Sequence, residues 1–291
     1  GQFLSLSTKG YIGAYKLLLA GAGTEDKLDY GKVQTLVARA IGRALENKLV
    51  KVAFSIPEVW LEKFSTQPVI SAMVEAVSLA SYRFTKYKSE EEKKKIRPLS
   101  EVILLVPPAR LRGGEEGVRL GIIFAEATVF ARDLVNEPAQ VTTPSYLASV
   151  ALDIAQSSKG KVKVTIFERH EAEKLGMGAF LGVAKGSDEL PQFIRLQYRP
   201  ARPEKKIVLI GKGITFDTGG LSLKSPEHME TMKLDMAGAA SVLAVFKMIA
   251  ELTPGVELIG LIPACENMPS GKALKPGDIL RAMNGKTIEV L

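Results

Sequence analysis

Short apolar runs alternate along the chain with longer segments in which apolar residues recur every three or four positions. The short runs end at turn-forming residues and predict strands, whereas the recurring spacing predicts amphipathic helices. Asp29 is placed to cap the first helix, because Val33, Val37 and Ile41 follow it on one helical face. In the first part of the chain these patterns predict strands at 16–20, 50–56 and 101–106 and helices at 29–45 and 68–82.

The second part of the chain repeats the alternation. A long helical pattern over 118–135 ends at the turn signal Asn136-Glu137-Pro138, and Thr143-Pro144 can begin another helix. The strands that follow contain few charges, which is typical of a parallel sheet covered on both faces. They are predicted at 162–167, 193–198, 207–210 and 256–262, with a helix over most of 229–252. The pattern as a whole predicts an α/β fold with a domain junction between its two parts.

The composition excludes several classes of protein. The 291 residues carry 39 Lys plus Arg against 32 Asp plus Glu, and the scattered net charge of +7 permits anionic partners without requiring them. No apolar stretch is long enough to span a bilayer, and no secretory signal pattern is present. Cys265 is the only cysteine, which excludes a disulfide framework and indicates a reducing compartment. The two histidines, His170 and His228, lie too far apart for a zinc finger or a two-histidine metalloprotease helix.

Charged residues gather after one of the buried strands. The glycine-rich segment 211–220 places Lys212 and Asp217 at the carboxyl end of that strand, the edge at which open α/β sheets bind ligands. Lys224 follows a few residues later. Asp235 stands in an otherwise apolar helical pattern, where a charge is costly unless it is paired or bound to a metal.

The residues alone leave two interpretations of this segment open. In the first, ion pairs join Lys212 to Asp217, and Lys224 or Lys233 to Asp235, because structural ion pairs are common. In the second, Asp217 and Asp235 hold a divalent cation. A lysine can then act as a ligand only as the neutral amine, a form that the metal's charge favours.

Several long motifs resemble those of the leucyl (cytosol) aminopeptidase family. They occur in one order and cover the chain from about residue 131 to its end, with a looser resemblance before that point. The motifs are ARDLVNEP at 131–138, LIGKGITFDTGGLSLK at 209–224, MKLDMAGAA at 232–240, CENMPSGKA at 265–273, KPGDI at 275–279 and NGKT at 284–287.

The resemblance implies a metallo-exopeptidase that removes the N-terminal residue, with a leucine-like preference, from peptides with a free N-terminus. Lys212, Asp217 and Asp235 are its implied metal ligands, with Asp217 bridging two ions. Lys224 is the implied catalytic lysine, which stabilises the polarised carbonyl. Met232 is implied to line the pocket for the first side chain, and all five residues contact the substrate. The implied cofactors are two divalent ions, zinc or manganese with magnesium as an alternative, together with bicarbonate.

The implied architecture is an N-terminal α/β (macro-like) domain followed by part of an α/β metallopeptidase domain with a central, mostly parallel sheet. We expect the N-terminal domain at 1–112, a linking helix and junction at 113–142, and the catalytic domain at 143–291. The resemblance further implies a cytoplasmic homo-oligomer, a hexamer, without a membrane partner.

The chain also departs from the family pattern. It ends at Leu291, where the family continues into an NTDAEGRL motif that supplies an aspartate, a glutamate and an arginine, and it begins at Gly1 without an initiator Met. We therefore expect an internal portion of such an enzyme, inactive by itself. A nucleotide- or DNA-binding module in the N-terminal domain is the alternative. It depends on the glycine turn at Gly21, which lacks the third glycine of a dinucleotide fingerprint, and on the net positive charge.

Overall fold

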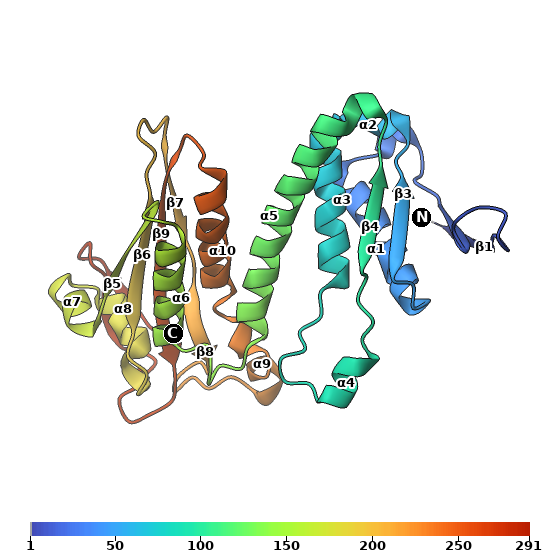
Figure 1. Cartoon of the computed structure of the whole chain (residues 1–291). Coiled ribbons are helices and arrows are strands. Elements are labelled where there is room, and N and C mark those ends of the chain that lie inside the picture. The colour runs from blue at the N-terminus through green and yellow to red at the C-terminus, as the bar shows by residue number, and fades with distance from the viewer. Residues whose placement is uncertain (1) are drawn as a thin grey trace. The chain divides into compact units, whose positions relative to one another are not determined.

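The computed structural model describes residues 2–291, and Gly1, the first residue of the expected N-terminal domain, lies outside the described residues. The chain divides into two compact units, which meet between Val129 and Phe130. Both units combine helices with strands (Figure 1), so the predicted α/β class is confirmed.

The first unit contains two small sheets. Strands β1 and β2 pair antiparallel, and strands β3 and β4 pair in parallel. β1, α2, α4 and the first two residues of α3 were not predicted from the sequence pattern. The elements are β1 (Phe3–Ser7), β2 (Lys16–Ala20), η1 (Glu25–Lys27), α1 (Tyr30–Glu46), β3 (Lys51–Ser55), α2 (Glu58–Phe64), α3 (Thr66–Ser81), α4 (Glu90–Lys95), β4 (Glu101–Leu105) and η2 (Pro108–Arg110). Helix α5 (Leu111–Asn136) begins in the first unit and ends in the second.

The core of the first unit forms where α1 and α3 pack together against β3 and β4. The Asp29 carboxylate accepts a hydrogen bond from the Lys32 amide at 2.7 Å and caps α1, as its position predicts. Val33 and Ile41 on α1 are fully buried. The helical spacing of the apolar residues thus decides which face of α1 meets the sheet.

Helix α5 begins seven residues before its predicted start at residue 118 and ends at Asn136, one residue after its predicted end. Its first turns carry charged side chains. Two of them, Arg119 and Glu116, form an ion pair with 2.7 Å between a guanidinium nitrogen and a carboxylate oxygen. Across residues 2–291, no helix combines the length and the apolar character needed to cross a membrane.

The second unit is built on one five-stranded sheet. Helix α6 begins at Pro144 with the Thr143 hydroxyl accepting from the Tyr146 amide, which confirms the predicted cap. The further elements are α6 (Pro144–Ser157), β5 (Val162–Phe167), α7 (Arg169–Lys174), α8 (Gly178–Val183), η3 (Ala184–Gly186), β6 (Gln192–Tyr198), β7 (Lys206–Ile210), β8 (Gly213–Asp217), α9 (Pro226–Met229), η4 (Met232–Leu234), α10 (Ala237–Leu252), β9 (Glu257–Asn267), β10 (Ile279–Arg281) and β11 (Thr287–Glu289).

The central strand of this sheet is β9. It pairs in parallel with β7 and β8, and antiparallel with β6, which in turn pairs antiparallel with β5. The sheet is therefore mixed, with β6 running against the direction of the other four strands. An apolar run reports burial, not direction, so the strand pattern could not reveal that β6 runs against its neighbours.

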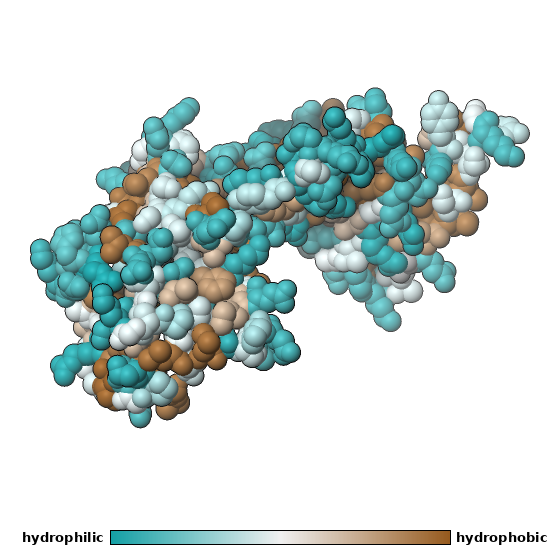
Figure 2. All heavy atoms as spheres, turned by 90° about the horizontal axis from the view of Figure 1, so that it is seen from below, coloured by the Kyte–Doolittle hydropathy of each residue, from teal (hydrophilic) through white to brown (hydrophobic). Residues whose placement is uncertain are grey.

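Helices α6 and α10 cover one face of the sheet (Figure 1). The opposite face of β7 carries Val208 and Ile210, which are 48% and 74% exposed. Figure 2 shows apolar side chains among the hydrophilic surface of this unit, at the left of the view. Val208 and Ile210 are therefore in contact with solvent in the part of the chain that the structure describes.

Phe246 holds α10 to the sheet, and its loss should destabilise the fold. Its ring is fully buried against Gly260 of β9, where a Cβ atom would come within 2.6 Å of it. We expect Phe246→Ala to lower the free energy of unfolding by about 3–5 kcal/mol, as measured by urea denaturation. Ser241→Ala, on the exposed side of the same helix, is the control and should change it by less than about 0.5 kcal/mol. Equal stability of the two variants would contradict this packing role.

Candidate active site

The edge of the sheet is interrupted between β7 and β8. β7 pairs with the first half of β9 and β8 pairs with its last residues, while Gly211 and Lys212 lie at the break between them. The Gly211 amide still donates to Leu261 O at 2.9 Å, so the two strands follow one another along β9. Lys212 therefore leaves the sheet in its middle, not at its end.

The first turn of α10 packs directly against this break. A Cβ atom on Gly211 would lie 2.5 Å from Gly238 O, and one on Gly238 would lie 2.8 Å from the Lys212 amide nitrogen. The Lys212 carbonyl accepts a hydrogen bond from the Ala239 amide at 2.8 Å. Two glycines are needed because backbone meets backbone here, and their contact brings Lys212 next to Asp235.

Asp235 ends the short turn η4, two residues before α10 begins. The apolar pattern predicted that Asp235 lies inside a helix. It lies before the helix instead, because residues 232–234 form a separate 3₁₀ turn. Lys212 Nζ lies 2.8 Å from Asp235 Oδ1 and 2.6 Å from Oδ2. Only the contact with Oδ1 has hydrogen-bond geometry, and Oδ2 is buried without a hydrogen bond from any described residue.

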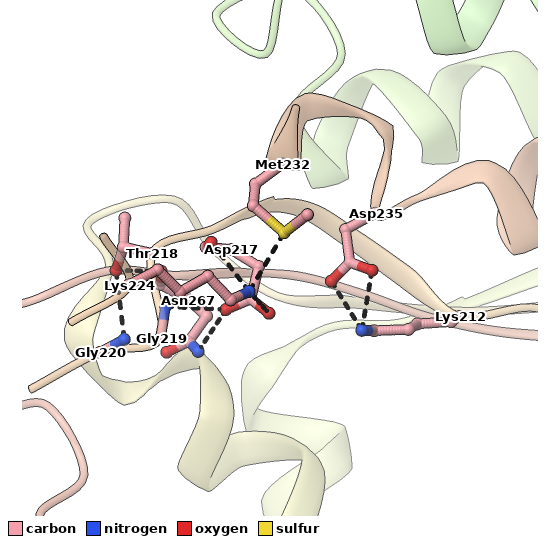
Figure 3. Close-up of polar contacts among 9 residues, drawn as sticks. All are labelled: Lys212, Asp217, Thr218, Gly219, Gly220, Lys224, Met232, Asp235 and Asn267. Atoms are coloured by element: carbon pink, nitrogen blue, oxygen red, sulfur yellow. Dashed lines mark hydrogen bonds and ion pairs between the residues drawn. The ribbon is translucent and has the colours of Figure 1, made fainter. Parts of the chain in front are cut away.

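The second carboxylate, Asp217, ends β8 and meets Lys224 (Figure 3). The intervening loop closes when the Lys224 amide donates to Thr218 O at 2.9 Å. Lys224 Nζ then donates to Asp217 Oδ2 at 2.5 Å and to Asp217 O at 3.2 Å. Gly219 has a φ of +86°, and a Cβ atom there would collide with Ser222 O, so the tight loop requires glycine at this position.

The environment of Asp217 favours its ionised form. Burial by itself acts to raise the pKa of this carboxyl, but hydrogen bonds from Lys224, the Gly219 amide and Asn267 outweigh it. The net pKa therefore lies below its ordinary value. Asp217 thus stays charged at neutral pH, although its side chain is only 16% exposed.

The ion pairs form in the opposite combination to the one the sequence suggested. Lys224 pairs with Asp217, and Lys212 pairs with Asp235. Lys233, the other expected partner of Asp235, instead donates to Asn136 O at 2.7 Å. The pairing was wrong because distance along the chain does not show that the loop after β8 folds back on itself.

The five predicted site residues come from two neighbouring segments, since β8 contacts η4. Met232 joins the group through its sulfur, which lies 3.1 Å from Lys224 Nζ. Figure 3 shows Asp217, Lys224 and Met232 pointing toward one another, with the pair of Lys212 and Asp235 beside them. The structure thus brings all five residues into one region.

A cavity of about 290 Å³ lies beside Lys212. Of the five predicted site residues, Lys212 alone lines this cavity. Its walls are mostly apolar and come from α8, β8 and β9. The remaining lining residues are Phe180, Val183, Gly213, Ile214, Pro263 and Cys265.

The side chains of this region can bind a cation or polarise a bound group. Asp217 and Asp235 offer carboxylate oxygens, and a lysine that loses its proton offers an amine nitrogen, all of which are donors for divalent ions. Within residues 2–291, however, no cluster of three or more His, Cys, Asp or Glu side chains is arranged to hold a metal ion. Any metal bound by these residues would therefore depend on two carboxylates and lysine.

Sequence reasoning assigned no role to Asn267, which the structure places at the site. Its amide nitrogen donates to Asp217 Oδ1 at 2.7 Å (Figure 3). Asn267 lies fifty residues from its partner, at the end of the longest strand. The signal that could have found it is a polar residue that directly ends a buried strand, at the same sheet edge as Asp217.

Comparison with known proteins points to one family. The sequence profile described as "Cytosol aminopeptidase family, catalytic domain" matches residues 129–291, and that of the family's N-terminal domain matches residues 1–91. Proteins named probable cytosol aminopeptidase from Persephonella marina and Alkaliphilus oremlandii are each 41% identical to this chain over its whole length. The chain covers 57% and 58% of these relatives, so it spans a little over half of their length.

A solved structure agrees with the sequence comparison. The structure described as "Bottromycin maturation enzyme BotP in complex with Mn" is similar to this chain with a TM-score of 0.81 and 31% sequence identity. The similarity covers 99% of this chain and 58% of that one.

Cys265 should be chemically inert in the folded protein, although it lies close to the site. Burial raises the pKa of its thiol to about 12, and the charge of Asp217 adds to the effect. At pH 8 the reactive thiolate is then present in on the order of one molecule in ten thousand. We expect iodoacetamide to leave Cys265 unmodified in the native state and to alkylate it after unfolding in urea, as followed by mass spectrometry. Rapid alkylation of the native protein would contradict this assignment.

Proposed function

The chain belongs to the cytosol aminopeptidase family, and from that premise we propose that it carries part of the active site of a metal-dependent aminopeptidase. The proposed reaction is hydrolysis of the first peptide bond in substrates with a free N-terminus. The relatives are named as aminopeptidases, and the chain covers a little over half of their length. The proposed activity is accordingly that of a protein with the length of these relatives.

The state of Asp235 carries the proposal. Its Oδ2 is buried, and among the described residues its charged partner is the Lys212 ammonium at 2.6 Å, in an ion pair without hydrogen-bond geometry. The positive group beside it is the Lys212 ammonium, whose own side chain is 59% exposed. A mostly buried carboxylate whose cationic partner is largely exposed to solvent fits a site at which a second cation can bind.

The residues present fit two divalent ions only in part, as two carboxylates and a lysine. We propose Asp217, Asp235 and the neutral amine of Lys212 as ligands. When bound, the ions supply Lewis-acid polarisation of the scissile carbonyl and lower the pKa of a water molecule. The similar BotP structure is described as a complex with Mn, which supports a metal of this kind.

Lys224 is proposed as the catalytic lysine. Its ammonium is held at Asp217 by hydrogen bonds to both Oδ2 and the main-chain carbonyl. A fixed cation at this position can donate a hydrogen bond to the carbonyl oxygen on which negative charge develops. Because the loop after β8 positions it beforehand, little reorganisation is needed when the reaction occurs.

Met232 is proposed to contact the first side chain of the substrate. Its sulfur packs against Lys224 Nζ, and its flexible thioether suits an apolar side chain of variable shape. The leucine-like preference, the choice among zinc, manganese and magnesium, the bicarbonate, the cytoplasmic location and the hexamer stay predictions. Their basis is the resemblance of the sequence motifs to the family.

Removing either carboxylate should remove metal and activity together. In the natural full-length protein, Asp217→Asn and Asp235→Asn each replace a charged donor by a neutral amide. We expect bound metal, measured by mass spectrometry, and hydrolysis of leucine amide to fall in parallel in both variants. Asp153→Asn, an exposed carboxylate on α6, is the control and should change neither. Full metal content with near-normal turnover in either site variant would refute the ligand assignment.

Lys224→Ala should separate catalysis from metal binding. The change frees Asp217 Oδ2 from its ammonium partner, so metal should be retained. We expect kcat to fall by about 10²–10³-fold, which is typical of losing one donor to a developing oxyanion. Lys272→Ala, an exposed lysine beyond β9, is the matched control. If Lys224→Ala loses metal before activity, the roles of Lys224 and Lys212 have been exchanged.

Residues 1–291 alone should bind at most one ion, loosely, and should not hydrolyse leucine amide at a useful rate. Two carboxylates and a lysine provide too few donors, because each ion normally takes about four or more ligands. Metal analysis and an activity assay on this segment, beside the natural full-length protein, test the prediction. Two tightly held ions with substantial turnover would show instead that Glu227, Glu266 or Asp278 completes the site.

A further inference from the structure

Asn267 connects the end of the central strand to the loop that carries the site. Its main-chain carbonyl accepts hydrogen bonds from the Thr218 amide at 3.0 Å and from the Thr218 hydroxyl at 2.8 Å. Its side-chain amide donates to Asp217 Oδ1 at 2.7 Å. The main chain of Asn267 therefore holds the loop, and its side chain acts on the carboxylate.

The side-chain bond has a defined direction. An ionised carboxylate only accepts hydrogen bonds, so Asn267 must present its NH₂ group and not its carbonyl to Asp217. The carbonyl end faces Gly220, where a Cβ atom would lie 3.2 Å from Asn267 Oδ1.

The two oxygens of Asp217 are consequently unequal. Oδ1 accepts from the Asn267 side-chain amide at 2.7 Å and from the Gly219 main-chain amide at 3.0 Å. Oδ2 accepts from the Lys224 ammonium at 2.5 Å. Two fixed donors on one oxygen set the plane of the carboxylate and direct the other oxygen toward Lys224 and Met232.

We propose that Asn267 is a positioning residue that orients the Asp217 carboxylate for cation binding. The inference rests on the proposed function, because Asn267 can have this role only if Asp217 is a metal ligand. A ligand whose orientation is fixed before the ion arrives does not lose side-chain entropy on binding. Partners of this kind typically contribute about 10- to 100-fold to metal affinity or activity.

A merely structural role for Asn267 is the competing explanation, and Thr218 separates the two. Thr218→Val keeps the shape of the side chain and removes the hydroxyl bond to Asn267 O, together with the bond that the same hydroxyl accepts from the Gly220 amide. It leaves the Asn267 amide and the Asp217 carboxylate in place. The variant therefore loosens the same junction without releasing the proposed ligand.

The test compares Asn267→Ala, Asn267→Leu and Thr218→Val in the natural full-length protein. Asn267→Leu keeps the branched shape but has no donor, so it provides a second measurement if the alanine variant fails to fold. Titration of the metal-free proteins with Mn²⁺ and Zn²⁺ gives the dissociation constants, and thermal unfolding gives the stabilities. Leucine amide hydrolysis gives kcat and KM.

We expect the metal dissociation constant to rise by about 10- to 100-fold in the two Asn267 variants, and to stay close to the wild-type value in Thr218→Val. This difference should persist even if all three variants lose similar stability. Wild-type affinity in the Asn267 variants would overturn the inference, and so would an equal loss of affinity in Thr218→Val.

Failure of this inference and failure of the proposed function give different results. If the wild-type protein binds neither ion and does not hydrolyse leucine amide, the proposed function fails and the inference fails with it. If the wild-type protein does both while the Asn267 variants match it, the function stands and only the positioning role is lost.

Discussion

A carboxylate that is withdrawn from water must be compensated by positive charge, and the arrangement around Asp217 and Asp235 follows from this requirement. Each carboxylate is mostly buried, and each has a lysine ammonium within ion-pair distance. The four side chains together carry no net charge. A divalent cation can enter such a group only if a lysine leaves its carboxylate or loses its proton. Because Lys212 is proposed to bind the ion as a neutral amine, metal binding under the proposed function releases its proton.

The sheet supplies the rigidity that this group needs. β9 spans eleven residues and pairs with β7 at one end and β8 at the other, so one strand aligns the segments that carry Lys212 and Asp217. The start of α10 packs against the break between β7 and β8 through contacts of glycine backbone, and η4 precedes it with Asp235. The buried residues of α10, among them Phe246, hold this helix against the sheet and thereby help to position Lys212 and Asp235.

Periodicity and caps are local signals, and they predicted most of the fold, as the helix capped by Asp29 shows. β8 escaped prediction, because glycine and threonine in 213–217 resemble a turn, and its strand conformation comes from pairing with β9. The sequence identified which residues lie at the site but not which of them form ion pairs. That pairing depends on how the loop at 218–224 folds back. Asn267 has no charge to mark it as unusual, so its contact with Asp217 becomes visible only when β9 is laid beside β8.

Two residues on β9 show how strongly position decides chemistry at this edge. Cys265 and Asn267 are separated by one residue, and both interact with the charged carboxylate of Asp217. For the buried thiol, that charge opposes ionisation and adds to the effect of burial, so a potentially reactive group is kept neutral. For the amide, the same charge strengthens a hydrogen bond and fixes its direction. The same carboxylate therefore opposes ionisation of the buried thiol, where burial is the larger effect, and accepts a hydrogen bond from the neighbouring amide.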